Sequence, residues 1–178
     1  RGSGRSTLVA ELATRARNKG CVVAVARSPA SLRETPFGAI TELLCAVTGV
    51  STEARATALR PALEKLQLPE ATITAALVIA GVVQLAHPFT AGQATQALRA
   101  VLKAGSSGRS VLLLFDGIEA FDGPSVETFR DLVMRAAPKE LTIGFVDPEV
   151  PLDRLGSVPS VDVTAFTRAD VAQWLTAT

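Results

Sequence analysis

The sequence predicts an α/β domain in which a mainly parallel sheet is covered by helices on both faces. Short, continuous apolar runs such as 21–26 (CVVAVA) and 111–115 (VLLLF) are typical of strands buried on both faces. The segments between these runs carry apolar residues at helical spacing, and this alternation is the pattern of three-layer α/β folds. With 178 residues, of which 48% are hydrophobic, the chain can bury the core of such a domain.

The first expected elements are a helix, a strand and a second helix. Residues 8–16 have helical apolar spacing, and Ser6 and Thr7 before them are suited to begin a helix. The run CVVAVA is the first strand. Pro36 stands where the next helix could begin, and residues 39–47 carry its apolar positions.

A long helical insertion separates the strands expected at 21–26 and 111–115. Its apolar spacing is helical throughout residues 52–103, with four expected interruptions, at Pro61, Pro69, Gly81 and Pro88. Within it, residues 71–86 (ATITAALVIAGVVQLA) carry no charge. A membrane span needs about 20 predominantly apolar residues, so we predict a buried helix here instead.

After the insertion, residues 105–108 (GSSG) are expected to form a flexible connector. They lead into the plainest strand of the sequence, VLLLF, which ends at Asp116 and Gly117. The remaining expected elements are a helix over 125–136 with Ser125 as its cap, a strand over 141–146, a short strand over 161–163, and a helix that Thr167 caps and that ends at Leu175.

Charge and composition exclude several function classes. The net charge is +1, from 18 basic and 17 acidic residues that are scattered along the chain. A nucleic-acid-binding face requires clustered Lys and Arg, so we do not expect this chain to bind nucleic acid directly. The N-terminus has no apolar leader and the two cysteines have no metal-type spacing. We therefore expect a cytoplasmic protein that does not enter the membrane.

The N-terminal residues form a candidate phosphate-binding loop ahead of the first helix. Such loops use glycines so that backbone N–H groups can turn toward phosphates, followed by a Lys and then a hydroxyl residue that binds magnesium. Arg5 holds the Lys position and Ser6 the hydroxyl position. The candidate nucleotide-binding residues are Gly2, Ser3, Gly4, Arg5, Ser6 and Thr7. The alternative is a glycine- and serine-rich terminus that only happens to precede a helix.

Asp116 is the second candidate, and we predict that it holds a magnesium ion together with Ser6. An acidic residue that ends an apolar strand can bind the water shell of magnesium beside the hydroxyl of the loop. The candidate loop and Asp116 strengthen each other, because they occur in the order loop, helix, strand, long connection and strand ending in Asp. Both also lie where open α/β sheets bind ligands, at the carboxyl ends of strands, so we expect Ser6 and Asp116 to face each other.

At this point the chain resembles a known group of proteins, the P-loop NTPase modules of the AAA+/STAND type in multidomain signalling and transcription-regulatory proteins. The segment GSGRSTLVAELATRARNKG is similar to their P-loop and first helix, and SVLLLFDGIEAFDGPSVETFRDLV to their Walker B segment, including Asp122. The segment TPFG at 35–38 matches the Pro-aromatic-Gly motif that follows their second strand. FTRADVAQWL looks like the start of their lid.

The resemblance implies a P-loop NTPase-like domain over residues 1–165 and the start of a helical lid over 166–178. It also implies a strand leading into the P-loop, which is central in this fold class. We expect the parent protein to supply that strand upstream of Arg1, because a missing central strand would expose two rows of unpaired backbone groups.

Three features of the sequence depart from the pattern of these modules. Arg5 replaces the Lys, Gly117 replaces the acidic residue that usually follows the Walker B Asp, and Val146-Asp147-Pro148 replaces a polar residue and Arg that often follow the next strand. Glu119 is a weak candidate for the catalytic base, and we expect its side chain to point to solvent. The combination predicts a domain that has kept the fold and has lost or reduced hydrolysis.

The sequence is compatible with three functions. The leading hypothesis is a degenerate ATPase that acts as a regulatory or scaffolding module, with ATP or ADP and Mg²⁺ bound weakly or no longer bound. The second is an active ATP-hydrolysing switch, and the third is a nucleotide-free protein-interaction domain. The expected partners are other domains of a larger parent protein or a separate protein.

Overall fold

The computed structural model describes residues 5–27, 35–135 and 139–146. Within them lies a three-stranded sheet formed by β1 (Val22–Arg27), β2 (Val111–Asp116) and β3 (Glu140–Phe145), in the order β1-β2-β3. Both strand pairs are parallel, and the last residues of β1 and β3 lie beside Asp116 at the end of β2. The predicted parallel α/β architecture is therefore confirmed.

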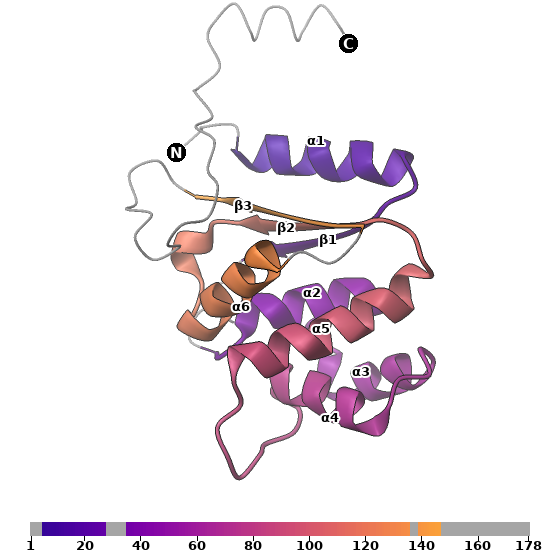
Figure 1. Ribbon diagram of the computed structural model, residues 1–178, viewed down its shortest axis with the longest axis vertical. Coiled ribbons are helices and arrows are strands. Elements are labelled where there is room, and N and C mark those ends of the chain that lie inside the picture. The colour runs from indigo at the N-terminus through magenta and orange to yellow at the C-terminus, as the bar shows by residue number, and fades with distance from the viewer. Residues whose placement is uncertain (1–4, 28–34, 136–138, 147–178) are drawn as a thin grey trace, which may run out of the picture.

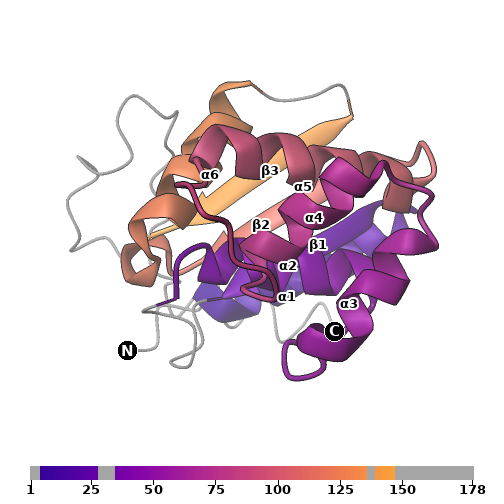
Figure 2. The same ribbon diagram turned by 90° about the horizontal axis from the view of Figure 1, so that it is seen from below.

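Helices cover both faces of the sheet (Figure 1). One face carries α1 (Arg5–Asn18), which packs on β1 and β2. The other face carries α2 (Gly38–Thr48), α5 (Ala91–Ser106) and α6 (Gly123–Met134). Figure 2, seen from this second side, shows α3 (Arg55–Glu64) and α4 (Glu70–Ile79) lying outside α2 and α5 as a further layer.

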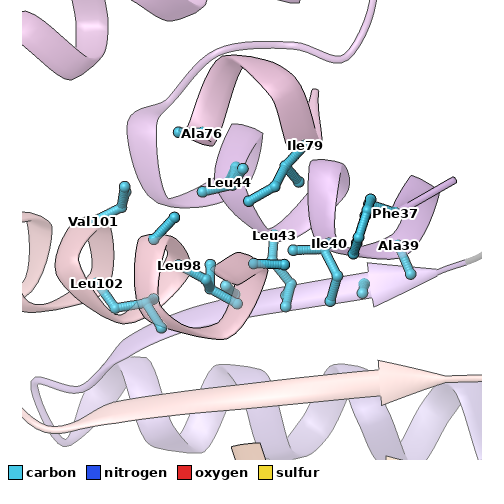
Figure 3. Packing of buried hydrophobic residues seen from close by; sticks show 14 of the residues in the cluster. Phe37, Ala39, Ile40, Leu43, Leu44, Ala76, Ile79, Leu98, Val101 and Leu102 are labelled. Carbon is cyan, nitrogen blue, oxygen red and sulfur yellow. The ribbon is translucent and has the colours of Figure 1, made fainter. Parts of the chain in front are cut away.

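The core is divided by the sheet into two unequal parts. The larger part lies between the sheet and the layer of α2, α5 and α6, and Figure 3 shows Ile40, Leu43 and Leu98 packed there above the strands. Leu44 points away from the sheet, toward Ile79 of α4. One side of α2 packs on the sheet and the other on α4, which belongs to the predicted helical insertion. The insertion therefore forms a packed layer of the domain.

The smaller part of the core holds α1 against the sheet. Val9 and Ala13 of α1 pack against Leu112 and Leu114 of β2. All six residues of β2 are buried, as the uninterrupted apolar run predicts. In β3, by contrast, Leu141 is 58% exposed, so the sheet face under α1 is covered best at β1 and β2.

The helical insertion confirms three of its four predicted interruptions. Pro69 precedes α4, Gly81 follows it with φ of +67°, and Pro88 lies in the connection to α5. Pro61 was expected to break the helix and instead lies inside α3. It is on the exposed face, where water can bind the carbonyl that loses its partner, while Leu59 and Leu63 anchor the opposite face in the core.

The predicted buried helix at 71–86 is shorter than expected. It ends at Ile79, and residues 84–86 are exposed because Gly81 turns the chain outward. No helix in the described ranges is long and apolar enough to cross a membrane.

Two other boundaries also differ from the prediction. Gly105 and Ser106 are the last turn of α5 and not a flexible connector, because Gly105 packs so closely on α2 that a Cβ there would lie 2.9 Å from Val47 Cγ1. Helix α6 begins two residues before the expected start, since Asp122 and not Ser125 caps it. The strand expected at 161–163, the helix ending at Leu175 and the lid over 166–178 lie outside the described residues.

Candidate functional site

The first turn of α1 meets the end of β2. Ser6 Oγ donates a hydrogen bond to Asp116 Oδ2 at 3.3 Å, and Arg5 Nε lies 3.1 Å from Asp116 Oδ1. Arg5 and Ser6 are the first two residues of α1, and Asp116 is the last residue of β2. The structure thus brings together the loop and strand residues predicted to face each other.

Packing of α1 fixes this meeting point. The apolar residues Val9 and Ala13 hold the helix on β2, with its N-terminal turn at the carboxyl end of the strand. The N-terminus of a helix presents free N–H groups and a partial positive charge, which favour anions. The first turn of α1 contains no acidic residue that would occupy these groups. Gly2, Ser3 and Gly4, the predicted phosphate-binding glycines and serine, lie outside the described residues.

Glu119 belongs to the same cluster, which corrects the prediction that its side chain points to solvent. Glu119 Oε1 lies 3.1 Å from Arg5 Nη1, and its side chain is 20% exposed. The reason is the turn after β2: Gly117 has φ of +80°, and the following 3₁₀ turn η2 (Ile118–Ala120) directs Glu119 back toward α1. A sequence pattern alone does not reveal this turn.

Gly117 lies directly beside the ion pair of Arg5 and Glu119. A Cβ at position 117 would lie 3.6 Å from Glu119 Oε1 and 3.8 Å from Arg5 Nη2. The second carboxylate of the cluster therefore comes from Glu119, two residues after the position where the sequence lacks an acidic side chain. The cluster contains one guanidinium and two carboxylates.

Asp116 is the most buried member of the cluster, with 8% of its side chain exposed. Its Oδ1 lies within ion-pair distance of Arg5, but the two groups are not aligned as a hydrogen bond, and no other described residue donates to this oxygen. A buried carboxylate oxygen without a donor is a suitable ligand for a hard cation such as Mg²⁺. Ser6 and Asp116 therefore fit the metal that the sequence predicts.

The described part of the chain offers few further ligands to such a metal. No group of three His, Cys, Asp or Glu residues within the described ranges could hold a metal ion by itself. Mg²⁺ commonly keeps several waters and binds through one or two protein ligands together with the phosphates of a nucleotide. This cluster is consistent with that mode of binding and not with a permanent all-protein metal centre.

Asp122 joins the segment before α2 to the start of α6, beside the cluster. Its carboxylate caps α6 by accepting from Ser125 N at 2.9 Å, and it also accepts from Phe37 N at 2.9 Å and Gly38 N at 3.0 Å. Phe37 has φ of +61°, a conformation that few non-glycine residues adopt. The Pro-aromatic-Gly segment before α2 is thereby tied to the segment after β2.

The end of β3 lies beside the same edge. Phe145 pairs with Asp116 in the sheet, and Gly117 N donates to Phe145 O at 3.1 Å. Val146 follows directly. Asp147 and Pro148, which replace the expected polar residue and Arg, lie outside the described residues.

A family model described as "AAA ATPase domain" matches residues 1–143 of the chain, a range that includes Arg5, Ser6, Asp116 and Glu119. This match covers most of the sequence and every element of the described sheet and its helices up to Ile143. The chain belongs to the AAA ATPase domain family.

Membership of the AAA ATPase domain family agrees with the fold and with the cluster at the carboxyl ends of the strands. Searches of curated proteins and of solved structures each found no significant match to the chain. The family model thus supports an ATPase-like module.

Proposed function

We propose that this AAA ATPase domain is a regulatory or scaffolding module of the STAND type, which binds ATP or ADP with Mg²⁺ and hydrolyses ATP slowly or not at all. The observation that carries the proposal is the cluster of Arg5, Ser6 and Asp116 at the N-terminus of α1. These residues supply the groups for phosphate and magnesium binding. Bound nucleotide would then favour one arrangement of the parent protein over another.

In this proposal each residue has a defined task. The N–H groups at the start of α1 and the Arg5 guanidinium bind phosphate oxygens, and the Ser6 hydroxyl and the Asp116 carboxylate hold Mg²⁺. The metal would neutralise phosphate charge and connect the β- and γ-phosphates to the protein. For Arg5 to reach a phosphate, it has to leave at least one of its two carboxylate partners.

Slow hydrolysis follows from the groups that the site lacks. Phosphoryl transfer depends on positioning and charge stabilisation, and the loss of one preorganised contact costs about 10²–10³ in rate. Positioning of water by a general base contributes on the order of 10²–10⁴. Gly117 has no side chain for that task, and in the sequence Asp147 replaces a residue that is often Arg in modules of this type.

The experiment is isothermal titration calorimetry with MgATP and MgADP, combined with phosphate-release assays. We expect saturable binding that Asp116→Ala weakens by about tenfold or more, since a charge-assisted contact contributes about 1.5–3 kcal/mol. We also expect phosphate release far below one turnover per second, the lower end of ordinary ATPases. No binding by the wild-type chain would overturn the proposal and favour the nucleotide-free interaction domain.

One observation favours a second candidate, the active ATP-hydrolysing switch. Glu119 lies at the site and not in solvent, so a carboxylate is available close to Arg5 and Asp116. Steady hydrolysis near one turnover per second that both Asp116→Ala and Glu119→Gln abolish would establish this second function. It would also show that the site has a catalytic base although position 117 carries no acidic side chain.

A further inference from the structure

Arg5 is held by two carboxylates in the structure. Its Nε lies 3.1 Å from Asp116 Oδ1 and its Nη1 lies 3.1 Å from Glu119 Oε1. The Arg5 side chain is 28% exposed, so water screens these ion pairs only in part. A cation of the chain itself therefore occupies the carboxylate that is expected to hold the metal.

This arrangement and magnesium binding exclude each other. Ser6 Oγ donates to Asp116 Oδ2 at 3.3 Å, and Arg5 lies against the other oxygen of the same carboxylate. Magnesium requires ligand oxygens at about 2.0–2.1 Å in an octahedral shell. For the ion and its water shell to bind beside Ser6, Arg5 has to move away from Asp116. The Ser6 hydroxyl can bind the ion through an oxygen lone pair while it still donates its hydrogen to Asp116.

Glu119 is the second carboxylate in contact with Arg5. Gly117 makes its approach possible, because its φ of +80° is a conformation that glycine adopts readily. The carboxylate of Glu119 lies on a short turn directly after β2, and Arg5 lies on α1, which packs on the same strand. Both partners are thus anchored to β2.

We infer that Glu119 is a positioning residue that holds the Arg5 guanidinium on Asp116, where it stands in place of the metal until magnesium nucleotide displaces it. The inference rests on the proposed nucleotide-binding function and adds a means of regulating it. The site of the free protein is closed by its own arginine. Any change that removes Glu119 from Arg5, including movement of the η2 turn by a partner, raises the affinity for magnesium nucleotide.

The size of the effect follows from the exposure of the ion pair. A partly exposed ion pair contributes about 0.2–1 kcal/mol, which corresponds to an affinity change of up to about fivefold. Calorimetry with MgADP should therefore show tighter binding for Glu119→Gln, by about 2–5-fold, and for Glu119→Ala in the same direction. Glu127→Gln, which removes the same charge from an exposed position of α6, should leave the affinity unchanged.

A second measurement needs no nucleotide. In the ¹⁵N NMR spectrum of the free wild-type protein, the signal of the Arg5 Nη1–H group should exchange slowly with water, because Nη1 donates a hydrogen bond to Glu119 Oε1. The signal should exchange faster in Glu119→Gln and on addition of MgADP to the wild type. Thermal unfolding of each variant verifies that the fold is retained.

The outcomes separate the inference from the function on which it rests. If neither the wild type nor any variant binds nucleotide, the proposed function is overturned and the inference with it. If the wild type binds and both Glu119 variants bind equally or more weakly, only the inference is overturned. Exchange of the Arg5 Nη1–H signal that is the same in Glu119→Gln and wild type also overturns it.

Discussion

Asp122 connects two parts of the chain that are distant in sequence. Its carboxylate accepts from two backbone N–H groups before α2 and from Ser125 at the start of α6. Loss of a helix cap costs about 0.5–2 kcal/mol, and a hydrogen bond to a charged group contributes about 1.5–3 kcal/mol, but contributions that share one carboxylate do not add in full. Removal of this one side chain therefore affects both segments at once.

We predict that Asp122→Ala lowers the free energy of unfolding by about 2–4 kcal/mol. Urea denaturation followed by circular dichroism measures this change. Asp122→Asn, which keeps an acceptor oxygen for the cap, should lose less than Asp122→Ala. The control is Glu127→Ala, an exposed residue on the same helix, for which a change within about 0.5 kcal/mol is expected. Equal stability of Asp122→Ala and the control would contradict the role assigned to Asp122.

Glu140 is a buried carboxylate at the start of β3, away from the candidate site. Burial raises the pKa of Glu140, and the nearby Arg99 opposes this rise. Because the folded state binds the proton more tightly than the unfolded state, the resulting stabilisation is present at acid pH. It is lost as the pH rises through the raised pKa of the folded protein.

We predict that Glu140→Gln removes this pH dependence and stabilises the protein most at neutral pH. Urea denaturation of wild type and variant at several values from about pH 4 to about pH 8 measures it. The stability difference should grow in favour of Glu140→Gln as the pH rises. A difference that stays constant, or that grows in favour of the wild type, would show that the Arg99 ion pair outweighs the cost of burial.

At the scale of single residues, the contact between Ser6 and Asp116 could be predicted from the sequence, but the position of the Glu119 side chain could not. The first two follow from motifs whose spacing fixes them to a helix start and a strand end, and the structure brings them into contact. Glu119 was expected in solvent, because its direction depends on the left-handed conformation of Gly117 and on the η2 turn. A glycine in a sequence permits such a turn without requiring it.

Among the elements, β3 depends on a glycine for its contact with α6 and η2. A Cβ at Gly144 would clash with Ile118 Cδ1 and would lie 2.7 Å from Phe129 Cζ. Phe129 is itself fully packed, with Phe115 at a centroid distance of 4.9 Å. Neither ring has space to move away without disturbing the core.

We predict that Gly144→Ala lowers the free energy of unfolding by about 1–3 kcal/mol or more, the usual cost of overpacking a core. Gly92→Ala is the matched control, since its Cβ would meet only Thr90 Oγ1, at 3.9 Å, on the exposed start of α5. That control should be neutral or slightly stabilising, because alanine favours a helix more than glycine does. Chemical denaturation of both variants tests this; equal stabilities would mean that β3 is free to shift.

Element types could be predicted more reliably than their ends. The run VLLLF is typical of a buried strand because it is short and continuous and ends at Asp116-Gly117, and β2 is indeed buried throughout. The prediction that Pro61 interrupts the helix is wrong. The effect of a proline depends on whether the helix face that it occupies is exposed, and this becomes known only from tertiary packing. The start of α6 was misplaced because Asp122 and Ser125 are both suitable caps, and only the contact with Phe37 and Gly38 explains why Asp122 is used.

For the whole molecule, the three-layer arrangement could be predicted because alternating strands and helices permit few other solutions. The order of the strands within the sheet could not be predicted, since every apolar run of this composition is equally suited to the centre of a parallel sheet. The unequal division of the core was also not predictable. It depends on α1 packing alone on its face, whereas the insertion adds α3 and α4 to the opposite side.

The pairing of β1 with β2 has a consequence for the order in which the protein folds. Val22 pairs with Val111, and the whole helical insertion lies between them in the sequence. Contacts among α3, α4 and α5 join neighbours along the chain and can form early, whereas closing the sheet requires the ends of a long loop to meet. Arg5, Ser6 and Asp116 come together only when α1 packs on the completed β1–β2 pair. We therefore expect folding to be limited by sheet closure, so that a chain emerging from synthesis acquires its candidate site last.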